Sequence, residues 1–345
     1  MSLPELSAAP GIGELGATAA SIAALQRPSG FIPWSAAGHG DPWNHLEAAL
    51  ALAVVGDGDG ARRALDFLAA TQRPDGSWHA GYCGDGEIDD DRLDTNGTAY
   101  VATGVLGCAL ALGEGALVRR HLAMMRRALD FVLAQQRPSG AICWSDAPAG
   151  AAGDLCLLAA CSSIYASLTA WVRAAALIGV EPATAPEVAP ATHRLRDAIV
   201  ARPECFADKR EYAMDWYYPV LAGVLEGDAA RQRLASGWER FVQPGRGVLC
   251  RSDHRWITTA ETAECALACL RCGLVDEAAA LLALAEHQRQ TDGSYLTGLV
   301  YPERSPFPAG ERTSYSAAAV VLAADALRGG VTAALFGAPS EPGAW

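Results

Sequence analysis

A short phrase, QRPSGF at Gln26–Phe31, recurs along the chain as QRPDGSW at Gln72–Trp78 and QRPSGAICW at Gln136–Trp144. A fourth copy, QRQTDGSY at Gln288–Tyr295, carries one extra residue. Each copy follows a stretch in which apolar residues recur at helical spacing. Repetition at a long period is typical of a fold that stacks copies of one supersecondary unit. The phrase therefore predicts a repeat architecture.

Two kinds of helical segment alternate between these phrases. One kind carries Arg and Glu along one side, as a solvent-facing helix does, and the other is almost entirely small or apolar, as a helix buried on every side must be. The first kind is expected at Leu15–Leu25, Gly60–Thr71, Leu117–Gln135, Ala191–Ala201, Ala229–Phe241 and Val275–His287. The second kind is expected at Trp43–Val55, Thr98–Leu112, Leu157–Ile178, Trp216–Leu225, Thr259–Leu270 and Thr313–Leu327.

This strict alternation predicts the fold class. Six inner and six outer helices joined by Gly-containing turns form an all-α, single (α/α)6 toroid, and no strand pattern competes with it. We expect one domain over residues 1–345, with repeats from about residue 15 to 327 and a short flexible C-terminal tail over about 328–345. Because each phrase leads from an outer into an inner helix, the N-termini of the inner helices gather on one rim, where we expect the mouth of a central cavity.

Composition excludes several classes of protein. The chain has 345 residues, 51% of them hydrophobic, a net charge of −12 and a single lysine, Lys209. An acidic chain without a basic stripe is a poor nucleic-acid partner, and one lysine makes Schiff-base chemistry improbable. Without a signal peptide or a bilayer-spanning stretch, its ten cysteines are expected to be free thiols. We expect a cytoplasmic protein with a small-molecule substrate and no membrane span, and a homo-oligomer is left open.

The Gln-x-x-x-Gly-aromatic turns on an α/α toroid resemble the QW repeats of the terpenoid cyclase and protein prenyltransferase superfamily, which includes squalene–hopene cyclases and the prenyltransferase/squalene oxidase repeat proteins. The resemblance extends from Leu15 to about Leu327. It implies a class II terpene cyclase-like enzyme, an isomerase or lyase, that protonates a small isoprenoid or a functionalised relative. In that family a DxDD motif followed by Thr-Ala supplies the acid, which burial and neighbouring carboxylates keep protonated.

The acidic segment after the second phrase is where this motif would lie, and it departs from the family pattern. Alignment on the Thr-Ala at 98–99 places DTNG (94–97) over the motif, whereas without that anchor EIDD (87–90) is an ExDD. The alternatives are a solvated acidic loop with Asp94 or Thr95 capping a helix, or a divalent-cation site. The candidates for the catalytic acid in this segment are Asp89, Asp90, Asp91 and Asp94.

Further candidates stand where other inner helices begin. Asp215, in MDWYYP at 214–219, is the acid expected to serve if the cluster at 87–94 is solvated, although it can also cap a helix. The segment CRSDHRWITTAETAE at 250–264 supplies acids, arginines and an aromatic residue, and contains a capping box. Glu47 opens the first inner helix together with Trp43 and His45. The residues expected to line the cavity and bind substrate are Trp43, His45, Trp216, Tyr217, Arg251, Asp253, His254, Arg255, Trp256, Arg312 and Tyr315. The three arginines in this set, Arg251, Arg255 and Arg312, could hold a diphosphate or carboxylate.

No cofactor is expected, and zinc or magnesium is the less favoured option. The zinc alternative follows the prenyltransferases, whose site combines Asp, Cys and His; here it would use Asp154, Cys156 and His254.

The rim is more polar than hydrocarbon cyclisation requires, because aromatics make up only 7% of the chain. The alternative function is therefore a carbohydrate-active (α/α)6 enzyme (a hydrolase, lyase or epimerase), since facing carboxylates with aromatic platforms suit sugar chemistry. A zinc prenyltransferase-like barrel and a non-catalytic ligand-binding barrel are the remaining alternatives.

Overall fold

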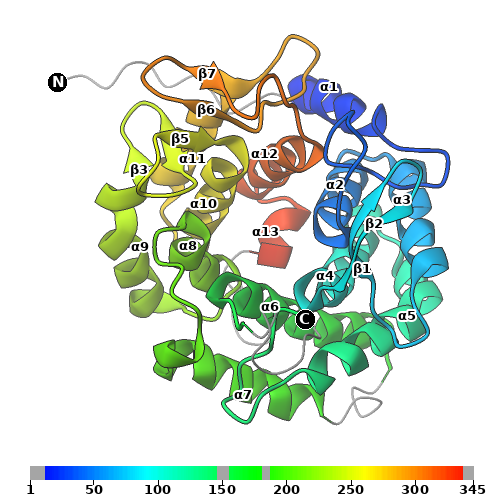
Figure 1. Cartoon of the computed structure of the whole chain (residues 1–345). Helices are drawn as coiled ribbons and strands as arrows, with labels where there is room; N and C mark the ends of the chain where they lie inside the picture. The colour runs from blue at the N-terminus through cyan, green and yellow to red at the C-terminus, as the bar shows by residue number, and fades with distance from the viewer. Residues whose placement is uncertain (1–11, 146–154, 181–186, 337–345) are drawn as a thin grey trace. The chain divides into compact units, whose positions relative to one another are not determined.

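The computed structural model describes residues 12–145, 155–180 and 187–336, most of which are helical (Figure 1). The chain divides into two compact units. Unit 1 comprises Met1–Ala24 and Arg210–Trp345, and unit 2 comprises Leu25–Lys209. No helix among the described residues is long and apolar enough to cross a membrane.

Unit 2 has two layers of helices. In the buried layer α4 packs against both α2 and α6; in the outer layer α3 packs on α2, α5 on α4, and α7 on α6. The buried helices are α2 (Pro42–Val54), α4 (Thr95–Leu112) and α6 (Leu158–Leu177). The outer helices are α3 (Gly58–Thr71), α5 (Gly115–Ala134) and α7 (Val188–Ala201), followed by the 3-10 turn η2 (Pro203–Cys205).

Unit 1 repeats this arrangement. Helix α10 packs between α8 and α12, while α9 covers α8, α11 covers α10 and α12, and α1 covers α12. The buried helices are α8 (Ala213–Leu221), α10 (Thr259–Arg271) and α12 (Ser314–Leu327). The others are α1 (Ile12–Ala23), α9 (Gly227–Phe241), α11 (Val275–Ala285) with the 3-10 turn η3 (Glu286–Gln288), and α13 (Val331–Phe336).

The two helix types differ in composition as the sequence predicts. Every residue of α4 from Thr95 to Ala109 is buried, which only a helix of small and apolar residues permits. Helix α5 buries one stripe that includes Leu117, Met124 and Leu129, while its arginines lie mostly on the other side. The alternation of apolar and polar-faced helices is therefore found within each unit. Helix α13 lies inside the stretch for which a flexible tail was expected, and the rest of that stretch, from residue 337, is outside the described residues.

The repeated turns fasten neighbouring outer helices to one another. In the second turn, the side-chain amide of Gln72 donates to the carbonyl oxygens of Gly76 and Met124, each at 2.9 Å. Its oxygen accepts a hydrogen bond from Arg127 of α5. Gly76 has a φ of 94°, and a Cβ there would lie 2.2 Å from the carbonyl oxygen of Arg127, so the position requires glycine. The same contacts recur with Gln26, Gly30 and Arg63, and with Gln136, Gly140 and Arg194.

The fourth turn keeps this backbone but not the glutamine. Its backbone hydrogen bonds match those of the other turns when Arg289, rather than Gln288, stands at the glutamine position. Gly293, at φ 85°, again approaches an outer helix, and a Cβ there would lie 2.7 Å from the carbonyl oxygen of Ala17 in α1. The close approach of glycine is thus the shared feature of the four turns.

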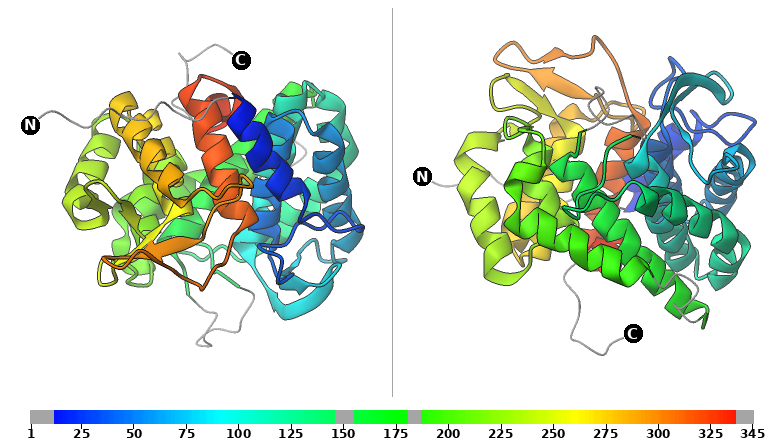
Figure 2. Two further views of the ribbon diagram at one scale, coloured as in Figure 1. Left: turned by 90° about the horizontal axis from the view of Figure 1, so that it is seen from above. Right: turned by 60° about the horizontal axis from the view of Figure 1, so that its bottom comes forward.

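Two small antiparallel sheets interrupt the helices, so the expectation that no strands are present is wrong. Unit 2 contains a hairpin of β1 (His79–Cys83) and β2 (Glu87–Leu93). Unit 1 contains a five-stranded antiparallel sheet of β3 (Val242–Gln243), β4 (Gly247–Leu249), β5 (Trp256–Thr258), β6 (Gly298–Val300) and β7 (Ser305–Pro306), with α10 and α11 between β5 and β6. Most of these strands are too short to show alternation, and EIDDDRL in β2 contains few of the β-branched and aromatic residues by which strands are recognised. Each sheet lies near the ends at which buried helices of its own unit begin (Figure 2).

Candidate active site

Three acidic side chains of unit 2 lie near the start of two buried helices. Asp41 and Asp94 are the N-caps of α2 and α4, and their side chains accept hydrogen bonds from the backbone N–H groups of Asn44 and Gly97. An aspartate at this position satisfies a backbone N–H that the helix leaves unpaired. Glu47 lies one and a half turns further along α2. The local sequence thus places two carboxylates by capping and the third by helical spacing.

Glu47 is buried, with 6% of its surface exposed. The indole N–H of Trp43 and the hydroxyl of Tyr100 both donate to its Oε1, at 3.1 and 3.2 Å. No donor within the described part of the chain reaches its Oε2. Burial raises the pKa of Glu47 to about 7, the two hydrogen bonds oppose that rise, and the charge of Asp41 adds to it. Such a carboxyl group holds a proton near neutral pH and has one oxygen from which to donate it.

Asp41 receives more hydrogen bonds than Glu47 does. Its Oδ2 accepts from the Trp34 indole at 2.7 Å and from the Asn44 side chain at 2.6 Å, and its Oδ1 accepts from the Asn44 backbone at 2.9 Å. Burial raises the pKa of Asp41, and these hydrogen bonds oppose the rise. Burial together with the charge of Asp41 raises the pKa of Asp94 to about 6. The charge on Asp41 therefore favours the protonated forms of both other carboxyl groups.

The acidic stretch at 87–91 lies on the β1–β2 hairpin instead. Asp89 and Asp91 are exposed on β2. Asp90 forms a hydrogen-bonded ion pair with Arg92, and this pairing lowers its pKa. An exposed, ion-paired carboxylate is ionised near neutral pH and is a poor proton donor. Of the four acid candidates in this segment, the structure brings only Asp94 into the cluster with Glu47.

A second acidic centre lies in unit 1, where α8 and α10 begin. The hydroxyl of Tyr217 donates to Oε2 of Glu264, a residue with 8% of its surface exposed. Burial and the charges of Glu264 and Glu261 raise the pKa of Tyr217 well above its ordinary value, so its hydroxyl keeps the proton. Burial and the charge of Glu261 also raise the pKa of the Cys250 thiol. Tyr217 is thus a predicted residue that does lie at an acidic centre.

Asp215 and Trp216 precede Tyr217 in the chain but contact the outer helix α9. The carbonyl of Asp215 accepts a hydrogen bond from Arg233 at 2.7 Å, and its carboxylate interacts electrostatically with the same guanidinium. The Trp216 indole donates to the Arg233 carbonyl at 2.8 Å, and its ring stacks on Phe241 with centroids 5.2 Å apart. These contacts stabilise the packing of α8 on α9.

His45 is buried among backbone groups of unit 2. Its Nδ1 lies 3.0 Å from the amide nitrogen of Ile32, and its Nε2 lies 3.0 Å from the carbonyl oxygen of Ala64. Burial lowers the pKa of His45 to about 4, so the ring is neutral and accepts at Nδ1 while it donates at Nε2. Both nitrogens are therefore occupied by the fold rather than available to a ligand.

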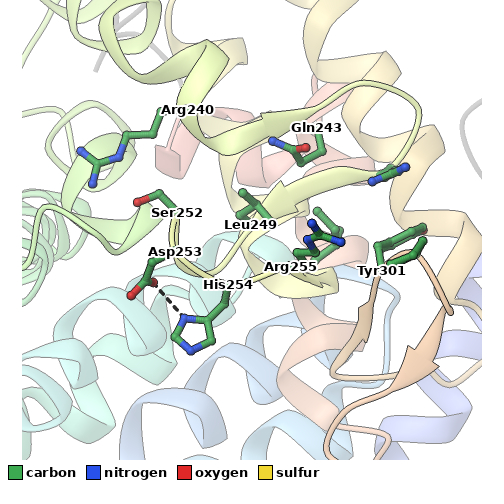
Figure 3. Close-up of a pocket in the computed structure, with 11 residues that line it drawn as sticks. Arg240, Gln243, Leu249, Ser252, Asp253, His254, Arg255 and Tyr301 are labelled. Atoms are coloured by element: carbon green, nitrogen blue, oxygen red, sulfur yellow. Dashed lines mark hydrogen bonds and ion pairs between the residues drawn. The ribbon is translucent and has the colours of Figure 1, made fainter.

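The other predicted substrate-binding residues lie in separate places. Arg312 forms an ion pair with Asp292 at 2.8 Å, and Tyr315 is half-buried in the first turn of α12. The Trp256 indole donates to the carbonyl of Phe307 at 3.0 Å. Asp253, His254 and Arg255 line a pocket of unit 1 (Figure 3). Arg251 forms an ion pair with Asp253.

The described residues contain no group of three or more His, Cys, Asp or Glu side chains that could hold a metal ion. Of the zinc alternative, Asp154 lies outside those residues, Cys156 belongs to unit 2, and His254 belongs to unit 1, where its Nδ1 lies 2.8 Å from Asp253.

No protein-family model matches the chain. Over 310 residues, however, it is 44% identical to the MMP endo-(1,4)-3-O-methyl-alpha-D-mannosidase of Mycolicibacterium hassiacum, and this match covers 90% of the chain and 85% of the mannosidase. The chain belongs to the family of that mannosidase. Such extensive identity to a carbohydrate-active enzyme overturns the assignment to the terpenoid cyclase and prenyltransferase superfamily, and with it the expected isomerase or lyase acting on an isoprenoid.

Solved structures resemble this chain in fold. A glycosidase solved in complex with glucose has a TM-score of 0.75 and 16% identity, and the match covers 92% of this chain and 98% of that one. A sugar epimerase from a ruminal bacterium has a TM-score of 0.65 and 12% identity, over 90% of this chain and 98% of that one. At these identities the likeness concerns the fold alone. The resemblance to terpene cyclases gave the wrong function because the Gln-Gly turn is a feature of outer-helix packing. Enzymes that catalyse different reactions can share the same helix packing.

Sequence reasoning did not select Asp41, Tyr100 or Glu264, and it noted Glu47 without giving it a role. One signal was available for the glutamates. Glu47 lies in WNHLEAALAL and Glu264 in TAETAECALAC, so each is an acid directly beside a run of small and apolar residues in a mostly buried helix. Burying an acid costs free energy unless the surroundings compensate or the group is kept protonated, which makes such a residue a candidate for function.

Proposed function

We propose that this chain is an endo-acting glycosidase that hydrolyses α-1,4 linkages of a 3-O-methylmannose-containing saccharide. The observation that carries the proposal is the 44% identity to an MMP endo-(1,4)-3-O-methyl-alpha-D-mannosidase over 90% of the chain. The structure supports it with two acidic centres near the N-terminal ends of buried helices, one in each unit. Glycoside hydrolysis requires one carboxyl group that gives up a proton and one that stays ionised.

Glu47 is the proton donor in this proposal. Its pKa of about 7 keeps a substantial fraction protonated near neutral pH, and its Oε2 is the oxygen that would protonate the departing glycosidic oxygen. Trp43 and Tyr100 hold the other carboxylate oxygen in place. The Trp43 ring also offers an apolar face of the kind on which sugar rings stack, and it packs against Tyr100 with centroids 5.8 Å apart.

Asp41 is the carboxylate that stays ionised and accepts a proton from the attacking water. Three hydrogen bonds from Trp34 and Asn44 stabilise its negative charge. In turn that charge favours the protonated form of Glu47. Two neighbouring carboxyl groups with different surroundings are thereby divided into an acid and a base.

We further propose that residues from about 15 to 327 form one (α/α)6 toroid domain, as the repeats predict. Support comes from the two-layer arrangement within each unit and from the likeness to a glycosidase over 92% of the chain. The proposal also keeps a cytoplasmic location, which suits ten cysteines that are all free thiols.

The direct test is hydrolysis of α-1,4-linked 3-O-methylmannose oligosaccharides by the purified chain, with the products separated by size and identified by mass. We expect internal cleavage, seen as short oligosaccharides early in the reaction, and slower cleavage of unmethylated α-1,4-mannose oligosaccharides of the same length. No cleavage of either series by a protein with native helical circular dichroism would refute the function.

The residue roles are tested on the same substrate with Glu47→Gln, Asp41→Asn and Glu264→Gln. We expect the first two variants to lose most activity. If Glu264→Gln is inactive while Glu47→Gln is not, the proton donor lies in unit 1 and the assignment to Glu47 is wrong.

A further inference from the structure

A pocket of about 570 Å³ lies on the five-stranded sheet of unit 1, and none of the residues assigned to hydrolysis lines it. It is enclosed by the end of α9, the β3–β4 turn, the β4–β5 turn and the residues after β6 (Figure 3). Leu249, Ile257 and Tyr301, which belong to one buried apolar cluster, contribute to its lining. Its volume is within the range of small-molecule sites.

The pocket carries a concentration of positive charge on an acidic chain. Arg240, Arg246 and Arg255 line it, whereas the whole protein has a net charge of −12. None of the three guanidinium groups has an acidic partner within ion-pair distance among the described residues. By contrast, arginines elsewhere, such as Arg92 and Arg312, are paired with aspartates.

The one acid lining the pocket is already neutralised by its neighbours. Asp253 accepts hydrogen bonds from Arg251 at 3.0 and 2.7 Å, and its Oδ1 lies 2.8 Å from Nδ1 of His254. Arg251 is in turn positioned over the ring of Tyr212, 4.9 Å from its centroid. Asp253 is therefore engaged on the pocket edge by groups other than the three unpaired arginines.

Tyr301 contacts the side chain of one of these arginines and the backbone of another. The guanidinium of Arg246 lies over the ring of Tyr301, 4.9 Å from its centroid. Tyr301 in turn donates its backbone N–H to the carbonyl of Arg255 at 2.9 Å, which fixes the spacing of these two segments. An arginine stacked on an aromatic ring loses less conformational freedom when it binds a planar or tetrahedral oxyanion.

We propose that this pocket binds a small molecule through a phosphate or carboxylate group held by Arg246 and Arg255 beside Tyr301, with the uncharged part lying over Leu249 on the side of Arg240 (Figure 3). Arginine forks pair with both kinds of oxyanion, usually through two parallel hydrogen bonds. A neutral saccharide would not require arginines without acidic partners in its pocket. The proposal goes beyond the hydrolysis reaction and does not rest on it.

The test is calorimetric titration of the full chain at low ionic strength with four probes: inorganic phosphate, mannose 6-phosphate, glucuronate and mannose. We expect saturable binding of at least one of the three anions, weakened by added salt, and none of mannose. Tighter binding of mannose 6-phosphate than of phosphate assigns a phosphorylated sugar, and preference for glucuronate assigns a carboxylate.

Arg246→Gln and Arg255→Gln should each weaken anion binding by about tenfold, because each removes a charge-assisted hydrogen bond. Arg126→Gln is the matched control, since Arg126 is an arginine on α5 that pairs with Asp130 in unit 2. The proposal fails if no anion binds saturably, or if binding is the same in both pocket variants and in the control. Because no step measures hydrolysis, this outcome is independent of the proposed glycosidase activity.

Discussion

Two acidic regions of unit 2 contrast sharply. The β1–β2 hairpin carries Asp89, Asp90 and Asp91 on an exposed strand, where Asp90 pairs with Arg92. The starts of α2 and α4 carry Asp41, Glu47 and Asp94, whose pKa values are all raised by burial. The hairpin has the denser acidic sequence, yet Glu47 and Asp94 at the helix starts are the carboxyl groups able to hold a proton near neutral pH.

The difference shows that solvent access, more than carboxylate density, decides which acids can do proton chemistry. The hairpin carboxylates face water, and hydrogen bonding to Arg92 lowers the pKa of Asp90. At the helix starts Glu47 is buried and Asp41 and Asp94 are half-buried, and the charge on Asp41 raises the pKa of both Glu47 and Asp94. A low-dielectric site amplifies each interaction and separates the groups into acid and base.

The largest effect is expected from Glu47→Gln, which keeps the shape of the side chain and removes its proton. Loss of a general acid lowers kcat by about 10²- to 10⁴-fold, measured on methylmannose oligosaccharides at pH 6. Circular dichroism checks that the variant is folded. A variant with more than about a third of wild-type kcat would show that the helix-start cluster is not the acid.

The second effect concerns stability. The pKa of Glu47 is about 7 in the folded chain against 4.5 for an exposed glutamate. Between these values the folded protein holds a proton that the unfolded chain releases, so this contribution to stability is fully present below pH 4.5 and is lost as pH rises through 7. We expect the free energy of unfolding of the wild type, relative to Glu47→Gln, to fall by up to about 3 kcal/mol across that window.

Urea unfolding from pH 4.5 to 8 measures this difference directly. Asp94, with a pKa raised to about 6, acts in the same direction in both proteins and cancels in the comparison to first order. A difference that is flat with pH would mean that Glu47 titrates like an exposed carboxyl group.

Much of the fold could be predicted from the sequence because its cause is local and repeated. A glycine that must lie against a neighbouring helix, as Gly76 lies against the carbonyl of Arg127, recurs after four of the outer helices, α1, α3, α5 and α11, and leaves a visible pattern. The fourth turn shows the limit, because Gln288 has the expected identity but Arg289 has the corresponding position. Identity at a repeated position is therefore less informative than the backbone geometry that it serves.

The site was harder to predict, because its chemistry depends on burial, which sequence reveals only indirectly. Asp90 and Glu47 are both acids near the start of the chain, and the former stands in the more conspicuous motif. Only packing shows that Asp90 is on a hairpin edge and that Glu47 is covered by Trp43 and Tyr100. His45 is the opposite case. The sequence suggests that it binds substrate, but in the fold both of its ring nitrogens form hydrogen bonds with backbone groups.

A smaller effect is expected from Tyr100→Phe. The Tyr100 hydroxyl donates to Oε1 of Glu47 and thereby favours the ionised form. Its removal should raise the pKa of Glu47 and move the high-pH limb of the kcat/KM profile upward by about one pH unit. Tyr165→Phe, on α6 and outside the cluster, is the control and should leave the profile in place. A downward shift in Tyr100→Phe would contradict the assigned hydrogen bond.

Asp94→Ala removes the N-cap of α4 and should lower the free energy of unfolding by about 1 kcal/mol at pH 8. Asp94→Asn keeps a capping oxygen toward Gly97 and should cost less. Thermal or urea unfolding of the pair separates the cap from the charge, and equal losses would indicate that the carboxylate charge rather than the hydrogen bond is what α4 requires.

The smallest effect is expected at the hairpin, with Asp90→Asn. Its ion pair with Arg92 involves side chains that are 32% and 62% exposed, and such pairs contribute between about 0 and 1 kcal/mol. We expect kcat on methylmannose oligosaccharides within about twofold of wild type and unfolding within about 0.5 kcal/mol. A loss of activity comparable to that of Glu47→Gln, without a loss of stability, would mean that the hairpin takes part in the reaction despite its exposure, and the distinction between the two acidic regions would have to be reversed.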